Sequence, residues 1–285
     1  DIFLNIIFWF LKRPNGMILT TGPTGSGKTT TLYAILKMLN QPGVKILTLE
    51  DPVEYRVEGV NQSQIEHSKD YTFAKGLRSI LRQDPDIVMV GEIRDLETAE
   101  IAVQAALTGH LMLSTVHTNS AAGAIPRMLA MGVRSFLLNP ALNAIVGQRL
   151  VRRLIEEKAI KKPLEEYDSQ IQEKVKRLLD ALPEDRKKEI EGKPLEFFVP
   201  HVANATDVGE GAADSSEMDA YKGRVGLYEI IRMTEDIQAL MNSGKISEAA
   251  IEEVARKDGM ITMVQDGVLK ALEGQTSLEE VFRVT

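Results

Sequence analysis

The chain has 285 residues, of which 44% are apolar and 26% are charged, and its formal net charge is −7. These fractions are typical of a globular protein and exclude a disordered chain, a collagen-like chain or a membrane bundle. The negative charge argues against a broad nucleic-acid surface, which needs clustered Lys and Arg. The chain has no cysteine, which excludes disulfides and thiolate metal sites.

Residues 2–11 form an apolar run with four aromatic side chains. The run is about half as long as a membrane span. It has neither the basic segment nor the cleavage site of a signal peptide, so we expect a helix that packs on a core. Such a helix would rest on something that precedes it, and the chain starts at Asp1 rather than Met. We therefore expect the chain to be part of a longer protein.

Four short apolar or β-branched runs each predict a buried strand. They are residues 17–21, 45–50, 87–90 and 111–116. The helical patterns between them are residues 29–39, 72–82 and 98–107. This alternation predicts an α/β fold with a parallel sheet flanked by helices. In such a sheet, functional side chains follow the carboxyl ends of the strands.

The middle of the chain reads as helical. Residues 120–153 are interpreted as helices, with Pro126 and Pro140 as starts or breaks. Between residues 163 and 194, apolar side chains recur at helical spacing on a background of Glu and Lys. This pattern predicts an amphipathic helix that ends near Pro183.

The last third of the chain has three parts. Residues 204–219 are rich in Ala, Gly, Ser and acidic side chains, and we interpret them as a mobile loop. Residues 224–231 alternate as a strand does. Residues 235–285 predict two to four amphipathic helices.

The strongest motif is GPTGSGKT, which fits the pattern G-x-x-x-x-G-K-[ST] between a predicted strand and a predicted helix. Its glycines leave room for backbone N–H groups around phosphate oxygens, and the helix start adds a partial positive charge. Lys28 is expected to reach the β and γ phosphates of a nucleotide, and the Thr29 hydroxyl to bind Mg²⁺. An ordinary glycine-rich turn is the alternative. The predicted phosphate-binding residues are Gly22, Pro23, Thr24, Gly25, Ser26, Gly27, Lys28, Thr29 and Thr30.

A second motif places an acid at the end of a strand. The apolar run at residues 87–90 leads through Gly91 to Glu92. A carboxylate there can hold Mg²⁺ through water or orient the attacking water. A structural acid paired with Arg94 is the alternative.

A third motif clusters acids after the run at residues 45–50. Glu50, Asp51 and Glu54 lie within five residues and would repel one another unless a cation faces them. The pattern favours a metal–phosphate site over an exposed acidic turn, and it does not rank the three acids. Arg78 and Arg82 share one face of a predicted helix, where they can clamp a phosphate or brace carboxylates.

Two histidines bracket the predicted strand at residues 111–116. His117 follows its carboxyl end, where it can sense the state of a nucleotide. His110 precedes the strand and is interpreted as structural. A rise of about 3.3 Å per residue separates the two too far for a shared metal. The Arg-rich run at residues 149–153 is interpreted as a solvated helix end or a subunit contact.

These segments together resemble the secretion ATPase superfamily, over residues 16–153 and from residue 221 to the end. The phosphate loop and the segments LEDPVEY, LRQDPDIVMVGEIRDLETAE and ALTGHLMLSTVHTN are similar to the family's Walker A, aspartate box, Walker B and histidine box. They favour the motors of type II secretion and type IV pilus assembly over pilus retraction motors.

The resemblance implies a RecA-like core that hydrolyses ATP with Mg²⁺. It assigns the polarisation of water to Glu54, with Glu92 beside it, and nucleotide sensing to His117. It further implies a homo-hexamer in the cytoplasm that reaches the inner membrane only through a platform protein of the pilus or secretion machine. No nucleic-acid partner is expected.

The resemblance also suggests three domains. Residues 1–153 would form the ATPase core, residues 154–220 an insert, and residues 221–285 a mainly helical subdomain. Most relatives carry two C-x-x-C pairs in the insert and this chain has none, so we expect no zinc. Relatives also have a preceding domain that donates arginines to the nucleotide. Without it we expect the chain to bind Mg-ATP, hydrolyse it slowly and form rings poorly.

Two other classes of protein stay open. A RecA-like helicase or DNA translocase would need a basic channel and stimulation by single-stranded DNA. A nucleotide-gated structural module would turn over little ATP, and the intact Lys28, Glu54 and Glu92 argue against it. The sequence does not separate pilus assembly from protein secretion.

Overall fold

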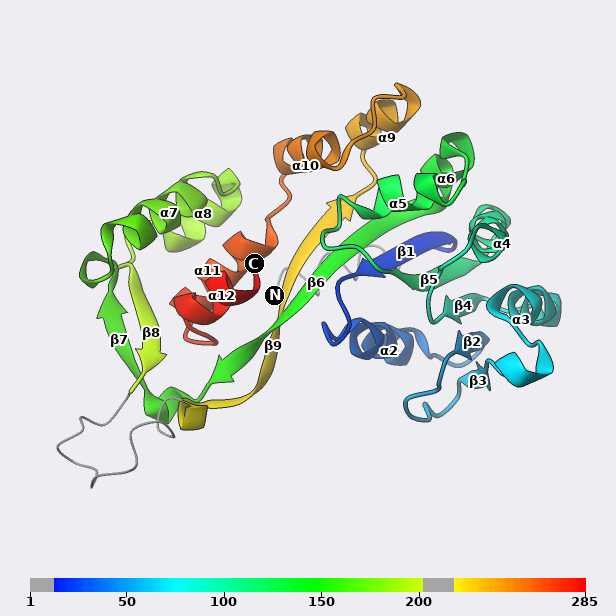
Figure 1. Cartoon of the computed structure of the whole chain (residues 1–285), viewed down its shortest axis with the longest axis horizontal. Coiled ribbons are helices and arrows are strands. Elements are labelled where there is room, and N and C mark those ends of the chain that lie inside the picture. Colours follow the sequence, from blue (N-terminus) through cyan, green and yellow to red (C-terminus); the bar gives the residue numbers. More distant parts are fainter. Residues whose placement is uncertain (1–12, 202–217) are drawn as a thin grey trace. The chain divides into compact units, whose positions relative to one another are not determined.

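A computed structural model describes residues 13–201 and 218–285 (Figure 1). The apolar run at residues 2–11 and all but the last two residues of the loop predicted at residues 204–219 lie outside the described residues. Among the helices that are described, none has both the length and the apolar character needed to cross a bilayer.

The chain divides into two compact units. They lie within Asp1–Gln148 plus Ile230–Asp258 and within Arg149–Glu229 plus Gly259–Thr285.

The first unit contains most of a sheet whose strand order is β3-β2-β4-β5-β1-β6-β9. The strands are β1 (Gly16–Thr21), β2 (Ile46–Glu50), β3 (Asn61–Gln64), β4 (Ile87–Val90), β5 (Leu111–Val116), β6 (Leu142–Leu154) and β9 (Tyr221–Arg232). The pairs from β3 through to β6 are all parallel. β6 and β9 each continue into the second unit.

The four strands predicted between residues 17 and 116 are present, and residues 224–231 lie within β9 as expected. β1, β2, β4 and β5 are buried along their whole lengths, which explains why they read as continuous apolar runs. The prediction of an α/β fold with a parallel sheet is confirmed.

Helices connect and cover these strands. They are α2 (Lys28–Leu39), α3 (Phe73–Ile80), α4 (Leu96–Leu107), α5 (Ala124–Ala130), α6 (Ser135–Ala141), α9 (Glu235–Asn242) and α10 (Glu248–Lys257). Side-chain capping fixes where several of these helices begin. At the start of α4, for example, the Asp95 side chain accepts a hydrogen bond from the Thr98 amide at 2.8 Å. α2 and α4 both contact β1 and β5.

The structure corrects the helical interpretation of residues 120–153. α5 and α6 lie there, but residues 142–154 form the strand β6. The first seven residues of β6 are buried, and the strand pairs with β1 from Met17↔Leu142 to Thr21↔Gly147. Burial on both faces removes the alternation that marks a strand, and pairing with a distant segment overrides local preference.

The second unit combines a two-stranded antiparallel sheet with helices. The elements are β7 (Ala159–Pro163), β8 (Glu196–Pro200), α7 (Ser169–Asp180), α8 (Glu184–Ile190), α11 (Met263–Leu272) and α12 (Leu278–Val284). α7 is the amphipathic helix predicted before Pro183. Its Val175 and Leu179 are buried in one cluster with Phe197 and Leu269.

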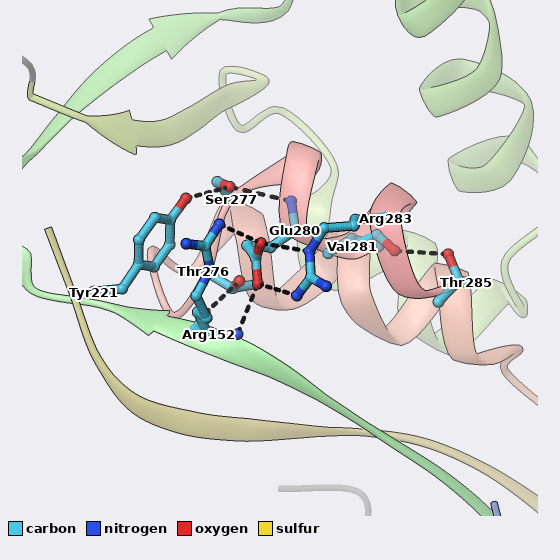
Figure 2. Close-up of polar contacts among 8 residues, drawn as sticks. All are labelled: Arg152, Tyr221, Thr276, Ser277, Glu280, Val281, Arg283 and Thr285. Carbon is cyan, nitrogen blue, oxygen red and sulfur yellow. Dashed lines mark hydrogen bonds and ion pairs between the residues drawn. The ribbon is translucent and has the colours of Figure 1, made fainter. Parts of the chain in front are cut away.

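The Arg-rich run at residues 149–153 also needs correction, because it lies on β6 and not at a helix end. Arg152 pairs with Glu280 of α12, a residue that is 1% exposed. Arg152 Nη2 lies 2.7 Å from Glu280 Oε1, and Arg283 donates to both Glu280 oxygens at 2.9 Å (Figure 2). The Arg152 guanidinium also stacks over the Tyr221 ring, 4.4 Å from its centroid. Arg152 therefore holds α12 on β6.

Candidate nucleotide site

The phosphate loop at residues 22–27 joins β1 to α2. Gly22 has φ of 146°, and a Cβ there would lie 2.5 Å from both the Gln148 carbonyl oxygen and Ser26 Oγ. Gly27 caps α2 with φ of 86°. Both positions require glycine, because other residues rarely adopt these angles and the loop is tightly packed at Gly22.

Lys28 lies at the start of α2 and is buried. Its Nζ donates to the carbonyl oxygens of Gly22 at 2.8 Å and Pro23 at 2.9 Å. Ser26 Oγ is buried and finds no hydrogen-bond partner within the described residues. A buried polar atom of this kind is costly unless a ligand supplies its partner. An ammonium, an unsatisfied hydroxyl and a helix start in one loop fit a phosphate group.

Sequence reasoning missed the residues that brace this loop. The Thr31 hydroxyl on α2 donates to Gln148 Oε1 on β6 at 2.8 Å, and both side chains are buried. The carbonyl oxygen of Gln148 also faces Gly22. Gln148 directly precedes the Arg-rich run at residues 149–153, and its role depends on β6 being a strand.

Glu92, Arg94 and His117 meet at the carboxyl ends of β4 and β5. Glu92 is 9% exposed. Its Oε2 lies 3.1 Å from His117 Nε2, and its Oε1 pairs with Arg94. Because β5 lies between β4 and β1, this group and the phosphate loop lie at the same edge of the sheet.

The pairing of Glu92 with Arg94 was the alternative considered from the sequence, and the pair is present. The Arg94 side chain is 68% exposed, so the ion pair is open to solvent and contributes little stability. A structural need for Arg94 is therefore small.

The three acids of LEDPVEY lie in different environments. Glu50 is 2% exposed and accepts the Tyr33 hydroxyl. Asp51 Oδ2 lies 2.9 Å from His67 Nε2. Glu54 is exposed. Hydrogen bonds to Glu50 and Asp51 and their separate positions thus relieve the repulsion expected from their spacing, and Asp51 and Glu54 both lie at the surface.

Arg78 on α3 and Arg82 in the turn after it were expected to clamp a phosphate or brace the acidic motif, but the contacts they make are different. Arg78 Nη1 lies 2.7 Å from Glu97 Oε1 on α4. Arg82 Nε donates to the Arg78 carbonyl oxygen at 3.1 Å. Within the described part of the chain, Arg78 therefore braces a carboxylate of α4 and not one of the acidic motif.

The other histidine of the strand motif has a backbone partner. His110 Nδ1 lies 3.1 Å from the Ala105 carbonyl oxygen, and the His110 carbonyl oxygen accepts the Gly16 amide at 3.1 Å. His110 precedes β5 and His117 follows it. These contacts agree with a structural role for His110.

Comparisons with known proteins agree with this geometry. The model of the family described as "Type II/IV secretion system protein" matches residues 4–283. A type II secretion system protein E from Aeromonas hydrophila is 46% identical over 281 residues, which is 99% of this chain and 51% of that protein. The type IV pilus assembly ATPase PilB of Myxococcus xanthus is 45% identical over 277 residues, which is 96% of this chain and 45% of that protein.

The fold has solved counterparts. The pilus retraction motor PilT, determined with bound ADP, superposes with a TM-score of 0.64 at 27% identity, covering all of this chain and 64% of that one. The chain spans about half the length of the curated relatives it matches. With the family model covering nearly all of its sequence, the chain belongs to the type II/IV secretion system protein family.

Proposed function

We propose that the chain is the ATP-hydrolysing part of a motor that drives type IV pilus assembly or type II protein secretion. The observation that carries the proposal is a phosphate loop with a buried Lys28 ammonium at the same sheet edge as the Glu92–His117 pair. Relatives named as type II secretion protein E and as pilus assembly ATPase support the proposal.

The side chains divide the chemistry among them. Lys28 and the backbone of the loop bind the β and γ phosphates. Glu54 polarises the attacking water, and Glu92 orients it. His117 contacts Glu92 directly. A change in the position of Glu92 on loss of the γ phosphate would therefore be transmitted to β5 through His117.

The donor set also fits Mg²⁺. The Thr29 hydroxyl, at the start of α2, and the Glu92 carboxylate are hard oxygen donors of the kind that Mg²⁺ prefers. Thr29 would bind the ion directly and Glu92 through water. When bound, the ion neutralises phosphate charge. We expect no structural zinc, because residues 154–220 contain His201 as their single histidine and no cysteine.

The remaining parts of the proposal concern the whole protein. We place it in the cytoplasm as a homo-hexamer that meets the inner membrane through a platform protein. The names of the relatives support a place in such a machine. We also propose the division into an ATPase core at residues 1–153, an insert at residues 154–220 and a subdomain at residues 221–285.

The proposal is tested by Lys28→Ala. Loss of the ammonium that meets the phosphates should weaken ATP binding by more than about 100-fold, since a buried charge-assisted contact is worth several kcal/mol. Equilibrium binding of ATP and phosphate release measure the effect. Lys75→Ala, which removes an exposed lysine of α3, is the matched control and should bind as the parent does. Unchanged affinity and turnover in Lys28→Ala would remove the phosphate-loop assignment.

A further inference from the structure

A buried hydrogen-bond network joins α2 to the end of β2. Tyr33 lies on α2, five residues after Lys28. It is fully buried, and its hydroxyl donates to Glu50 Oε2. Glu50 is the last residue of β2 and also accepts the Thr48 hydroxyl at 2.5 Å. The network therefore starts on the same helix as the phosphate-binding lysine.

The network continues into the loop that carries Glu54. Gln62 Nε2 donates to Glu50 Oε1 at 3.1 Å and lies 3.3 Å from the Tyr33 hydroxyl oxygen. Burial, together with the hydrogen bond and the charge of Glu50, raises the pKa of Tyr33. Hydrogen bonding from the backbone at Glu54 and Tyr55 opposes that rise in the pKa of Tyr33. The Tyr33 hydroxyl thus lies between Glu50 of β2 and the Gln62 side chain, which in turn bonds the loop backbone at Tyr55 and Val57.

Two further contacts fasten this loop. The rings of Tyr33 and Tyr55 pack edge to face with centroids 4.6 Å apart, an arrangement worth about 0.5–1.5 kcal/mol beyond burial. Gln62 also donates to the Tyr55 carbonyl oxygen at 3.1 Å and accepts the Val57 amide at 2.8 Å. Because the Glu54 side chain is exposed, its place depends on this anchored backbone.

We infer that Tyr33 is a positioning residue that sets the place of Glu54 relative to the phosphate loop. The inference rests on the proposed role of Glu54 in polarising water. Lys28 and Tyr33 belong to one helix of 12 residues, so the phosphate-binding end and the hydroxyl move together. A displacement of about 1 Å in a reacting group can cost about 100-fold in rate. The link therefore acts on turnover and not on nucleotide affinity.

Tyr33→Phe separates this role from ordinary packing. Phenylalanine keeps the buried ring and its edge contact with Tyr55, and Glu50 keeps its hydrogen bonds from Thr48 and Gln62. The substitution removes the hydroxyl that connects α2 to the acidic loop. Tyr55→Phe is the matched control, because Tyr55 contributes its ring and its carbonyl oxygen.

The experiment measures steady-state turnover, equilibrium ATP binding and amide hydrogen exchange of residues 51–57. For Tyr33→Phe we expect kcat to fall about tenfold, with the affinity for ATP within about twofold of the parent, the signature of an interaction used only in the transition state. Exchange in residues 51–57 should become faster. Tyr55→Phe should leave kcat, the affinity for ATP and the exchange of residues 51–57 unchanged. If amide exchange of residues 51–57 is unchanged in Tyr33→Phe, the Tyr33 hydroxyl does not position this loop, whatever the value of kcat.

A double variant tests whether Tyr33 acts through Glu54. If it does, Tyr33→Phe combined with Glu54→Gln should be no slower than Glu54→Gln alone. Multiplied losses, or full activity of Tyr33→Phe beside an impaired Glu54→Gln, would overturn this inference alone. Full activity of Glu54→Gln would overturn the proposed role of Glu54 as well. If Tyr33→Phe does not fold, Gln62→Ala replaces it as the test. This variant removes the hydrogen bonds of Gln62 on β3 to Tyr33, Glu50 and Tyr55, and it is expected to show the same faster exchange and lower kcat.

Discussion

At the scale of single residues, Glu92 contacts both Arg94 and His117 in the candidate site. Glu92, Arg94 and His117 were selected from two separate motifs, and the structure brings them into direct contact. Arg78 was selected as well, but its partner is Glu97. The first group was predictable because parallel strands end at one edge. A long exposed arginine has no such constraint.

Glu280 is a buried acid that the sequence did not indicate. Burial alone would raise its pKa, but hydrogen bonds from Arg283 and Arg152 outweigh burial and lower the pKa from 4.5 to about 2 (Figure 2). A carboxyl whose folded pKa is depressed stabilises the fold above its unfolded pKa. That contribution is lost as the pH falls from about 4.5 towards about 2.

We therefore predict that Glu280→Gln destabilises the fold at neutral pH by about 2 kcal/mol, because two arginines lose their charged partner. The difference in unfolding free energy between parent and variant should shrink by about 1–2 kcal/mol between pH 6 and pH 3. Urea unfolding of parent and variant at a series of pH values measures this difference in unfolding free energy. A constant difference across that range would show that the ionised Glu280 carboxylate does not stabilise the fold.

At the scale of elements, burial decided what could be predicted. β4 and β5 have the bounds expected from their apolar runs. β3 was missed because its sequence, NQSQ, is polar, and it exists as a strand through pairing with β2 at the sheet edge. β6 was misread because residues 142–148 are buried on both faces and show no alternation. The β7–β8 pair was also missed, since its pairing is not local.

The amphipathic helix α7 gives an element-scale prediction. Leu179 is 7% exposed within the cluster that also contains Phe197, so Leu179→Ala should lower the unfolding free energy by about 2–4 kcal/mol. Lys176→Ala, on the exposed face of the same helix, should change it by less than about 0.5 kcal/mol. Chemical unfolding measures both. Equal effects would mean that the apolar face of α7 does not hold residues 169–180 in place.

At the scale of the whole molecule, the family assignment and the site support one account. The family model covers residues 4–283, and the phosphate loop and the paired Glu92 lie at the same edge of the sheet. The net charge of −7 argues against a broad nucleic-acid surface. Because the chain spans about half of its curated relatives, the motor and its hexamer are proposals for the whole protein.

The central claim is that ATP is hydrolysed at this site, and phosphate release with Mg-ATP tests it most directly. The parent should release phosphate, at a rate unaffected by single-stranded DNA. Glu92→Gln should bind ATP normally and hydrolyse it about 10²–10⁴-fold more slowly, because it loses the group that orients water. Glu100→Gln, an exposed acid of α4, should match the parent. Hydrolysis by Glu92→Gln at the parental rate would contradict the account.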